Sequence, residues 1–183
     1  MTGAIGFSGY KKDAPLFSKL IMFFTDSQWS HSFLTFFPAN NTETVIEAGH
    51  SVQVTPFARY RGDPNRTYEI YALNGIEKKA SDAALDYIFH EYSGAVYGFL
   101  QIPWFGYRWF WRQVGRDVGR EANWFPSGKI CSELVWDYET TVAGNFEKLL
   151  ANSPITENTC SPEDLYRIVK ANQDLLILIE SNT

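Results

Sequence analysis

Hydrophobic and polar residues alternate in several short stretches of the first half of the chain, as they do in half-buried β-strands. The alternation is clearest in "SVQVTPF" (51–57) and "TYEIYAL" (67–73). Residues 3–9, "GAIGFSG", predict a short strand that enters a Gly/Ser turn. Residues 31–38 are rich in strand-favouring residues, and the loop "ANN" makes residues 42–49 their predicted hairpin partner. The pattern predicts an antiparallel sheet.

Apolar residues at helical spacing predict helices elsewhere in the chain. Residues 14–25 carry apolar side chains three or four positions apart, namely Leu16, Leu20, Ile21 and Phe24. A second helix is predicted over 82–93, with Ser81 as its N-cap and Gly94 as its stop.

The last third of the chain adds two helices and a strand. Residues 131–142 place Leu134, Val135, Tyr138 and Val142 on one face, and Gly144 ends the predicted helix. "SPED" (161–164) combines a serine N-cap, a proline at the first helical position and acids in the first turn. "DLLILIE" (174–180) predicts a closing buried strand. The order of elements indicates the α+β class, built around an antiparallel sheet.

Composition and charge narrow the possible functions. The 183 residues suit a single domain spanning residues 1–183. The net charge of −5 gives no basic field, so no nucleic-acid partner is expected. No apolar run approaches the roughly 18–20 residues of a membrane span, and the N-terminal stretch lacks the layout of a signal peptide. We therefore expect a cytoplasmic or virion-associated protein whose two cysteines are free thiols.

The stretch "GKICSELVW" (128–136) places Cys131 where a glycine-containing loop turns into a predicted helix. A catalytic cysteine needs a lowered pKa, because the thiolate and not the thiol is the nucleophile. The helix N-terminus supplies about half a positive charge, and a nearby imidazole can supply the rest and carry the proton. Cys131 is therefore a candidate nucleophile. The alternative is a packing role, because free cysteines are among the most buried residue types. Cys160 has no visible base and is expected to be a spectator.

Three histidines could serve as the base. His90 lies within a predicted helix and His50 in a turn, which favours structural roles for both. His31 opens a strand, where its side chain can point across a cleft, and it is our choice for the general base. Glu47 lies on the neighbouring predicted strand and is the candidate acceptor that orients the imidazole, since cross-strand Cβ atoms lie about 5 Å apart. Glu47 is equally well explained as one polar member of an alternating strand.

Four segments of the chain resemble the circularly permuted branch of the NlpC/P60 papain-like cysteine hydrolases, the YiiX/YebB-like group. "FSKLIMFFTDSQWSHSFLTF" resembles the N-terminal helix and the Ser-His strand of that family, and "VIEAG" resembles the strand with the polar third residue. "GAVYGFLQI" resembles the segment whose tyrosine precedes the nucleophile helix. "ICSELVWDYE", with the later "SPEDLY", resembles that helix and the turn behind it. The histidine precedes the cysteine, as permutation requires.

The resemblance implies a papain-like fold in which the nucleophile helix packs on a small antiparallel sheet. It implies that Cys131 is the nucleophile, that His31 is the base and later the acid, and that Glu47 orients His31. It also implies that Tyr97 donates a hydrogen bond near the oxyanion, beside the backbone N–H of Cys131. The aromatic and arginine-rich insert at about 99–127 departs from the family pattern and could rebuild the substrate groove.

This insert contains "IPWFGYRWFWRQVGRDVGR" (102–120), where aromatic residues crowd together and arginines recur every four positions. One interpretation is a wall that binds an anionic polymer, with the substrate-binding candidates Trp104, Trp109, Arg108 and Arg112. A second is docking to a membrane surface or a protein partner through 102–120. The third is an ordinary amphipathic helix with its rings in the core and its arginines in solvent. Gly115 and Gly119 weaken a continuous helix there.

The expected activity is that of a thiol (cysteine) peptidase or amidase, which cleaves an amide bond through an acyl-enzyme. The resemblance makes a cell-wall (peptidoglycan) peptide bond the first substrate class, in a bacterium or in a bacteriophage lysis or virion protein. Two alternatives stay open: a lipid acyl hydrolase or acyltransferase, and a catalytically inactive papain-like module with a binding or virion structural role. No histidine or cysteine spacing indicates zinc, and no glycine-rich phosphate loop is present, so neither a metal nor a cofactor is expected.

Overall fold

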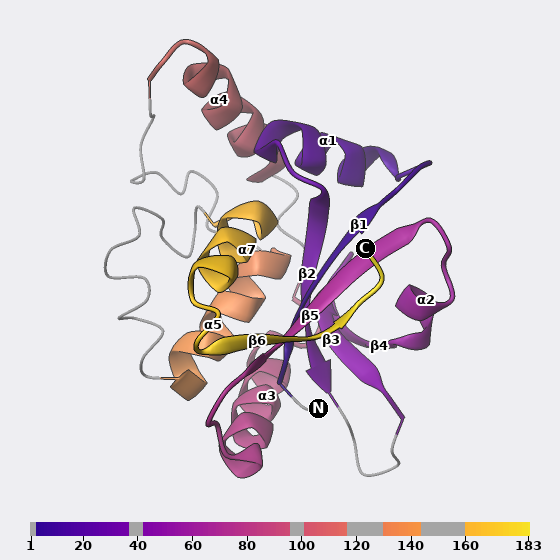
Figure 1. Cartoon of the computed structure of the whole chain (residues 1–183), viewed down its shortest axis with the longest axis vertical. Coiled ribbons are helices and arrows are strands. Elements are labelled where there is room, and N and C mark those ends of the chain that lie inside the picture. Colours follow the sequence, from indigo (N-terminus) through magenta and orange to yellow (C-terminus); the bar gives the residue numbers. More distant parts are fainter. Residues whose placement is uncertain (1–2, 37–41, 96–100, 117–129, 144–159) are drawn as a thin grey trace.

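The computed structural model describes residues 3–36, 42–95, 101–116, 130–143 and 160–183 (Figure 1). The strands are β1 (Ile5–Tyr10), β2 (Trp29–Phe36), β3 (Thr44–Ala48), β4 (Val52–Pro56), β5 (Arg66–Leu73) and β6 (Leu176–Ser181). The helices are α1 (Leu16–Thr25), α2 (Ala58–Arg61), α3 (Lys78–Tyr92), α4 (Gln101–Gln113), α5 (Cys131–Ala143) and α7 (Pro162–Ala171). This composition confirms the predicted α+β class.

All six strands form one antiparallel sheet in the order β4-β3-β2-β1-β5-β6. The predicted hairpin of β2 and β3 is confirmed, and β4 continues it as the neighbour of β3. The N-terminal strand β1 lies in the middle of the sheet between β2 and β5. Segments from both ends of the chain therefore share one sheet.

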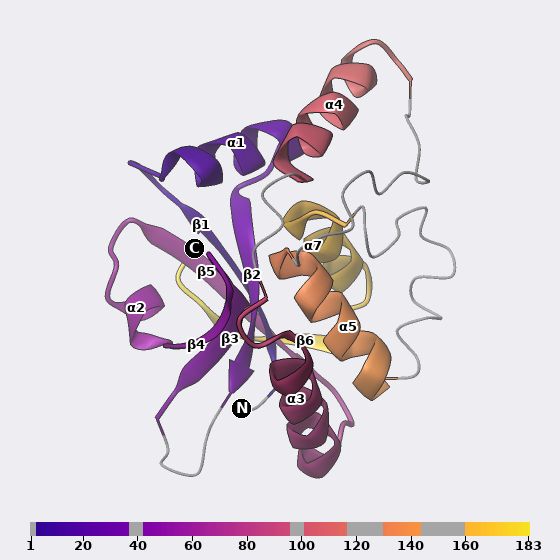
Figure 2. The same ribbon diagram turned by 180° about the vertical axis from the view of Figure 1, so that it is seen from behind.

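Each face of the sheet is covered by helices and carries its own core. Figures 1 and 2 show α3, α5 and α7 together on one side of the sheet and the short helix α2 on the other. The larger core lies under the three helices and includes Ile5, Phe7, Leu34, Leu85, Leu134 and Val135. The smaller core lies under α2 and includes Phe33, Val45, Phe57, Tyr60, Tyr68 and Ile70. The helix of Cys131 thus packs on the sheet, as the sequence predicts.

Two sequence predictions about boundaries and burial are wrong. The closing strand β6 is predicted to be buried, but Ile177, Leu178 and Ile179 are 45–47% exposed. The reason is position, because β6 is the outermost strand and pairs with β5 alone. Helix α3 begins before the predicted cap, and Ser81 lies inside the helix, where its hydroxyl is 2.7 Å from that of Tyr138. The Ser81 side chain therefore contacts Tyr138 of α5 and does not cap α3 as the local sequence predicts.

The predicted start of α7 is confirmed in detail. The Asp164 N–H donates to the Ser161 hydroxyl over 3.1 Å, and the Ser161 N–H donates to the Asp164 carboxylate over 3.0 Å. This reciprocal pair is a capping box, and Pro162 stands at the first helical position. The cap therefore satisfies the N–H of Asp164 in the first turn of α7 and the N–H of Ser161 just before it.

The helices α1 and α4 pack against each other at one end of the molecule (Figures 1 and 2). The Trp109 ring of α4 lies 5.1 Å from the Phe23 ring and 6.3 Å from the Phe24 ring of α1. Gly106 makes this approach possible, because a Cβ there would lie 3.1 Å from the Phe24 ring. Helix α4 ends before Gly115, whose φ is +73°, so this glycine does stop the helix.

The pairing of β1 with β2 is irregular where β2 begins. The register shifts between Ser8 and Gly9, so that Ser8 pairs with His31 and Gly9 with Trp29. A Cβ at Gly9 would lie 1.8 Å from the carbonyl oxygen of Gln28, so no other residue fits there without moving the start of β2.

Within the described residues, no helix is long and apolar enough to cross a membrane.

Candidate active site

Cys131 is the first residue of α5 and is 1% exposed. The backbone N–H of Ile130, just before the helix, donates to the carboxylate of Glu133 in the first turn over 3.1 Å. This contact is one half of a capping box, and the carboxylate also complements the positive end of the helix. The N–H of Cys131 belongs to the first turn, where helical geometry gives it no intrahelical acceptor. The thiol therefore stands at a defined helix N-terminus.

His31 lies near the start of β2, and its Nε2 is 2.9 Å from Oε2 of Glu47 on β3. The strands pair as predicted, but Glu47 lies directly opposite Phe33, so His31 reaches it diagonally across the ladder. The two side chains are 17% and 10% exposed. The carboxylate therefore fixes the orientation of the imidazole and occupies one of its two nitrogens.

Two hydroxyl groups hold Glu47 in turn. Thr55 on β4 donates to Oε1 over 2.5 Å, and the phenol of Tyr60 on α2 donates to Oε2. Burial raises the pKa of Glu47, but hydrogen bonds from His31, Thr55 and Tyr60 and the charge of His31 outweigh it and lower this pKa to about 2. The orienting group is therefore an ionised carboxylate at neutral pH.

The charges of Cys131 and His31 depend on each other. Burial opposes the charged form of both groups, but the thiolate and the imidazolium attract each other and share a hydrogen bond. These effects lower the pKa of Cys131, and together with Glu47 they raise the pKa of His31 well above its ordinary value of 6.5. The N–H and hydroxyl of Ser32, next to His31, further lower the pKa of the thiol. Both shifts favour the thiolate–imidazolium form of the pair over the neutral form.

This arrangement has the three parts of a nucleophile–base–orienter set. Because Glu47 occupies Nε2, Nδ1 is the nitrogen left for the sulfur of Cys131. The carboxylate stabilises the imidazolium, and the imidazolium stabilises the thiolate. The set can attack a carbonyl carbon and return a proton to a leaving group.

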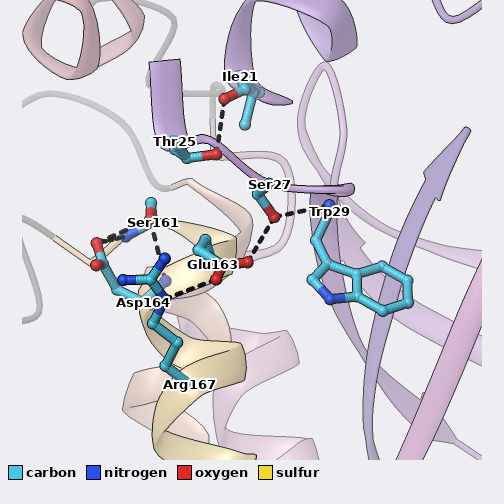
Figure 3. A network of polar contacts seen from close by, with 8 residues as sticks. All are labelled: Ile21, Thr25, Ser27, Trp29, Ser161, Glu163, Asp164 and Arg167. Atoms are coloured by element: carbon cyan, nitrogen blue, oxygen red, sulfur yellow. Dashed lines mark hydrogen bonds and ion pairs between the residues drawn. The ribbon is translucent and has the colours of Figure 1, made fainter. Parts of the chain in front are cut away.

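A polar network fixes the start of β2 relative to α7 (Figure 3). The Ser27 hydroxyl accepts from the N–H of Trp29 over 2.8 Å and donates to the carboxylate of Glu163 over 2.6 Å. Arg167 donates to the other oxygen of Glu163 over 2.7 Å. Because Trp29 is two residues before His31, these contacts help to position the imidazole.

A cleft of about 290 Å³ opens beside His31 and Glu47. Phe17 of α1 and Ile102 of α4 give it an apolar side, while Arg59 and Arg66 give it a basic side. A larger hollow of about 580 Å³ lies elsewhere, next to Ser81 and Tyr138, and none of the three candidate catalytic residues lines it. The smaller cleft is the better candidate for substrate binding, because it reaches the base and its orienter.

The four substrate-binding candidates of α4 have different environments. Trp104 is buried with Phe105 and Ile130, and Trp109 packs on α1. Arg108 lies 3.7 Å from the carboxylate of Asp164, with its side chain 12% exposed, whereas Arg112 is exposed. The interpretation of α4 as an ordinary amphipathic helix, with its rings in the core and its arginines in solvent, therefore holds only in part. A role of these four residues in substrate binding stays a prediction. Tyr97 lies outside the described residues.

The remaining histidines and cysteine differ from the candidate set. His50 lines the cleft, and His90 is exposed on α3. Cys160 is fully buried, and burial together with nearby carboxylates raises its pKa well above 9.0. The structure therefore brings Cys131, His31 and Glu47 together and leaves Cys160 without a basic partner of this kind.

Sequence reasoning missed three residues that shape the site, namely Thr55, Tyr60 and Ser32. Thr55 lies in the recognised alternating strand, but a threonine is common there and carries no specific signal. Tyr60 lies on α2, a four-residue helix that the sequence pattern does not predict. Ser32 directly follows His31 and carries no signal beyond that of ordinary strand sequence.

No family model and no curated protein matches the chain. Among solved structures, the chain is similar to the crystal structure of metalloprotein yiiX from Escherichia coli O157:H7, described as DUF1105. The TM-score is 0.62 and the identity is 19%, with 100% of this chain and 97% of that chain covered. At this identity the likeness concerns the fold alone, and in that sense the chain has a YiiX-like α+β fold.

Proposed function

We propose that the chain is a cysteine hydrolase that cleaves an amide bond through an acyl-enzyme. The observation that carries this proposal is the meeting of Cys131, at a helix N-terminus, with His31, which is itself 2.9 Å from the Glu47 carboxylate. A buried ion pair of this composition is costly for a purely structural role, because both charges lose hydration. His31 and Glu47 line the cleft, and their perturbed pKa values there favour a catalytic role.

The proposed reaction begins when the Cys131 thiolate attacks the carbonyl carbon and the carbonyl electron pair moves onto oxygen. The backbone N–H of Cys131 is a donor for this oxyanion. Protonated His31 then gives its proton to the amide nitrogen as the C–N bond breaks, which leaves a thioester. Neutral His31 next takes a proton from water, the resulting hydroxide attacks the thioester, and the C–S bond breaks to restore the thiolate. Glu47 stays ionised throughout and holds the imidazole in place.

A peptidoglycan peptide bond is the first substrate class to test, and it rests on the resemblance of the sequence to the permuted NlpC/P60 group. The likeness to yiiX supports that resemblance, because the YiiX/YebB-like group includes a protein of that name. It also supports a papain-like, circularly permuted arrangement as the finer description of the fold. A cytoplasmic or virion-associated location remains part of this proposal.

Because yiiX is described as a metalloprotein, we asked whether this chain offers a metal site of its own. Among the residues that the structure describes, no three His, Cys, Asp or Glu side chains are placed to hold an ion together. Glu47, the carboxylate nearest to His31, already accepts hydrogen bonds from Thr55 and Tyr60. The described residues therefore offer no set of ligands for a metal, and no step of the proposed reaction passes through one.

Digestion of purified peptidoglycan by the wild type and by Cys131→Ser tests the proposal, with the products read by mass spectrometry. New peptide ends produced by the wild type alone would support both the activity and the bond class. A hydrolysis that Cys131→Ser retains would overturn the role of the thiol. Cys160→Ser is the matched control and should cleave like the wild type.

A lipid acyl hydrolase or acyltransferase is the second candidate, favoured by the apolar side of the cleft at Phe17 and Ile102. Release of fatty acid from detergent-dispersed acyl esters, with peptidoglycan left intact, would favour this candidate. Labelling separates both enzymes from an inactive module. Iodoacetamide should modify Cys131 well before Cys160 near neutral pH, whereas equally slow labelling would favour a binding or structural role.

A further inference from the structure

The helices α1 and α4 expose large apolar side chains on neighbouring surfaces. Five such side chains on the two helices, and Val114 just after α4, are between 41% and 68% exposed and define what we call the α1–α4 surface: Leu16, Phe17, Phe23, Tyr107, Phe110 and Val114. They are more than half of the large apolar side chains that are exposed in the described part of the chain. Isolated exposed apolar residues are ordinary, but a group of this size on two packed helices marks a contact surface.

All charged residues within helices α1 and α4 are basic, whereas the exposed carboxylates of Asp13 and Asp26 lie just outside the two ends of α1. Helices α1 and α4 contain no acidic residue, although the whole chain has a net charge of −5. Lys19 and Arg112 are exposed on these helices, and exposed Arg116 follows α4 and lies over the Trp111 ring. None of these three cations has an acidic partner among the residues that the structure describes. The surface therefore combines aromatic rings with unpaired positive charge.

We propose that the α1–α4 surface docks on an anionic lipid bilayer. Aromatic and aliphatic side chains enter the boundary between headgroups and acyl chains, while lysine and arginine pair with anionic headgroups. An acidic protein would otherwise be repelled by such a membrane, so the local reversal of charge on these two helices is what makes docking possible. The surface attaches to the membrane interface, because neither helix is able to span a bilayer.

The position of the cleft relative to the α1–α4 surface indicates how the docked molecule would be oriented on the membrane. Phe17 belongs to the α1–α4 surface and also lines the cleft, together with Ile102 of α4 and the proposed base His31. Figures 1 and 2 show α1 and α4 at one end of the molecule, beside the start of β2. Docking through this surface therefore holds the mouth of the cleft near the headgroups.

Vesicle sedimentation with the full-length protein tests the proposal. Phosphatidylcholine vesicles are compared with vesicles that contain about one third phosphatidylglycerol, at low salt and at about 1 M salt, where the Debye length is about 3 Å. We expect binding to the phosphatidylglycerol vesicles at least tenfold tighter than to neutral ones, and most of this difference should disappear in high salt. Equal binding to both kinds of vesicle, or none, would overturn the proposal.

Paired substitutions locate the contact. Phe23→Ser/Phe110→Ser and Lys19→Gln/Arg116→Gln should each weaken binding about tenfold or more, since each cation near an anionic surface strengthens binding roughly fivefold. The matched control is Leu178→Ser/Ile179→Ser on β6, where the side chains are similarly exposed but away from the surface. Equal losses in the control would overturn the assignment of the surface. Circular dichroism shows whether each variant is folded.

Two further measurements exclude other occupants. Sedimentation velocity without lipid tests for a second copy of the chain, and a dimer that Phe23→Ser/Phe110→Ser abolishes would overturn the proposal. Brominated acyl chains should quench the fluorescence of the intact protein on binding, because Trp109 and Trp111 lie on α4, and an unquenched bound protein would contradict docking by this face. Cys131→Ser should bind vesicles like the wild type, so this test is independent of the proposed hydrolysis.

Discussion

The N-termini of α5 and α7 each have a buried cysteine nearby, and the two thiols have opposite properties. Cys131 is 1% exposed and Cys160 is 0% exposed, so burial does not distinguish them. The two helix starts are even joined, because the Ser132 hydroxyl donates to the carbonyl oxygen of Cys160 over 2.5 Å. Yet the pKa of Cys131 is lowered and that of Cys160 is raised.

The difference lies in what surrounds each sulfur. Cys131 faces His31, whose positive charge Glu47 stabilises, whereas Cys160 lies near the carboxylate of Asp164, with Arg108 as a weaker opposing influence. Cys160 stands before the capping box of α7, in which Ser161 bonds the N–H of Asp164, whereas Cys131 is itself the first residue of α5. A helix N-terminus therefore does not activate a thiol by itself; the neighbouring imidazole decides the outcome.

Removal of the His31 imidazole should have the largest effect on the difference in reactivity between Cys131 and Cys160. We expect His31→Ala to slow alkylation of Cys131 by iodoacetamide about 100-fold near neutral pH, because the thiolate loses its counter-charge. Mass spectrometry of the two cysteine peptides measures both rates in one sample. His90→Ala, at an exposed position of α3, is the control and should change neither rate. An unchanged ratio of the two rates in His31→Ala would refute the account of Cys131.

Removing the charge of the orienter should have the next largest effect. Glu47→Gln keeps the size of the side chain but withdraws the negative charge that favours the imidazolium, so we expect hydrolysis to slow about 10- to 100-fold. The initial rate of product release measures this. Glu43→Gln removes a carboxylate close by on the surface, where it pairs with Arg61, and should leave the rate unchanged. Equal rates for Glu47→Gln and the wild type would mean that the carboxylate does not support the reaction.

The alkylation rates of the two thiols should also depend differently on pH. Because the pKa of Cys131 is lowered and that of Cys160 is raised, alkylation of Cys131 should become fast at a lower pH than alkylation of Cys160. Hydrolysis should fall as the pH rises through the raised pKa of His31, because neutral His31 has no proton for the leaving amine. Parallel pH profiles of alkylation for the two cysteines would contradict the ion pair.

The hydroxyl of Tyr60 should contribute a smaller share. Tyr60→Phe keeps the ring that packs 4.6 Å from Phe33 but removes the hydrogen bond to Glu47. We expect a loss of about threefold in hydrolysis and about 1 kcal/mol in the free energy of unfolding, which is typical of one hydrogen bond. Tyr68→Phe, which loses a bond to Glu180 of 2.9 Å, serves as control and should affect stability only.

The capping box of α7 should matter for stability and not for chemistry. Ser161→Ala removes the acceptor of the Asp164 N–H, and we expect a loss of about 1 kcal/mol in the free energy of unfolding, measured by urea denaturation. The alkylation rate of Cys131 should stay the same. A fall in that rate would mean that the cap of α7 also supports the environment of Cys131.

Much of the fold is predictable because its signals are local. Strand patterning predicts the β2–β3–β4 meander, and the Ser161 capping signature predicts the start of α7. Burial is less predictable, because it depends on which elements cover which. The apolar run of β6 is typical of a buried strand but lies at the sheet edge, and α1 has helical spacing although only Ile21 and Thr25 are buried on it.

The three principal residues of the candidate site can be predicted from the sequence, but the residues that hold them in place cannot. Cys131, His31 and Glu47 have chemically distinctive side chains, and the hairpin pattern places the last two on paired strands. Thr55 and Tyr60 reach Glu47 only through the register of β4 and the path of α2, which no local pattern specifies. The exposure of Phe23 and Phe110 follows from the docking of α4 on α1, a contact between segments far apart in the chain.

The close approach at Gly9 makes the position of His31, and so the proposed chemistry, depend on a residue that has no part in the proposed reaction. Any side chain there would collide with the carbonyl oxygen of Gln28 and displace the backbone that leads into His31. If the proposed activity is correct, a mutational survey scored by turnover should rank Gly9 close to Cys131, although Gly9 is not among the residues that line the cleft. Sensitivity of a position to substitution therefore does not show that its residue would contact a substrate.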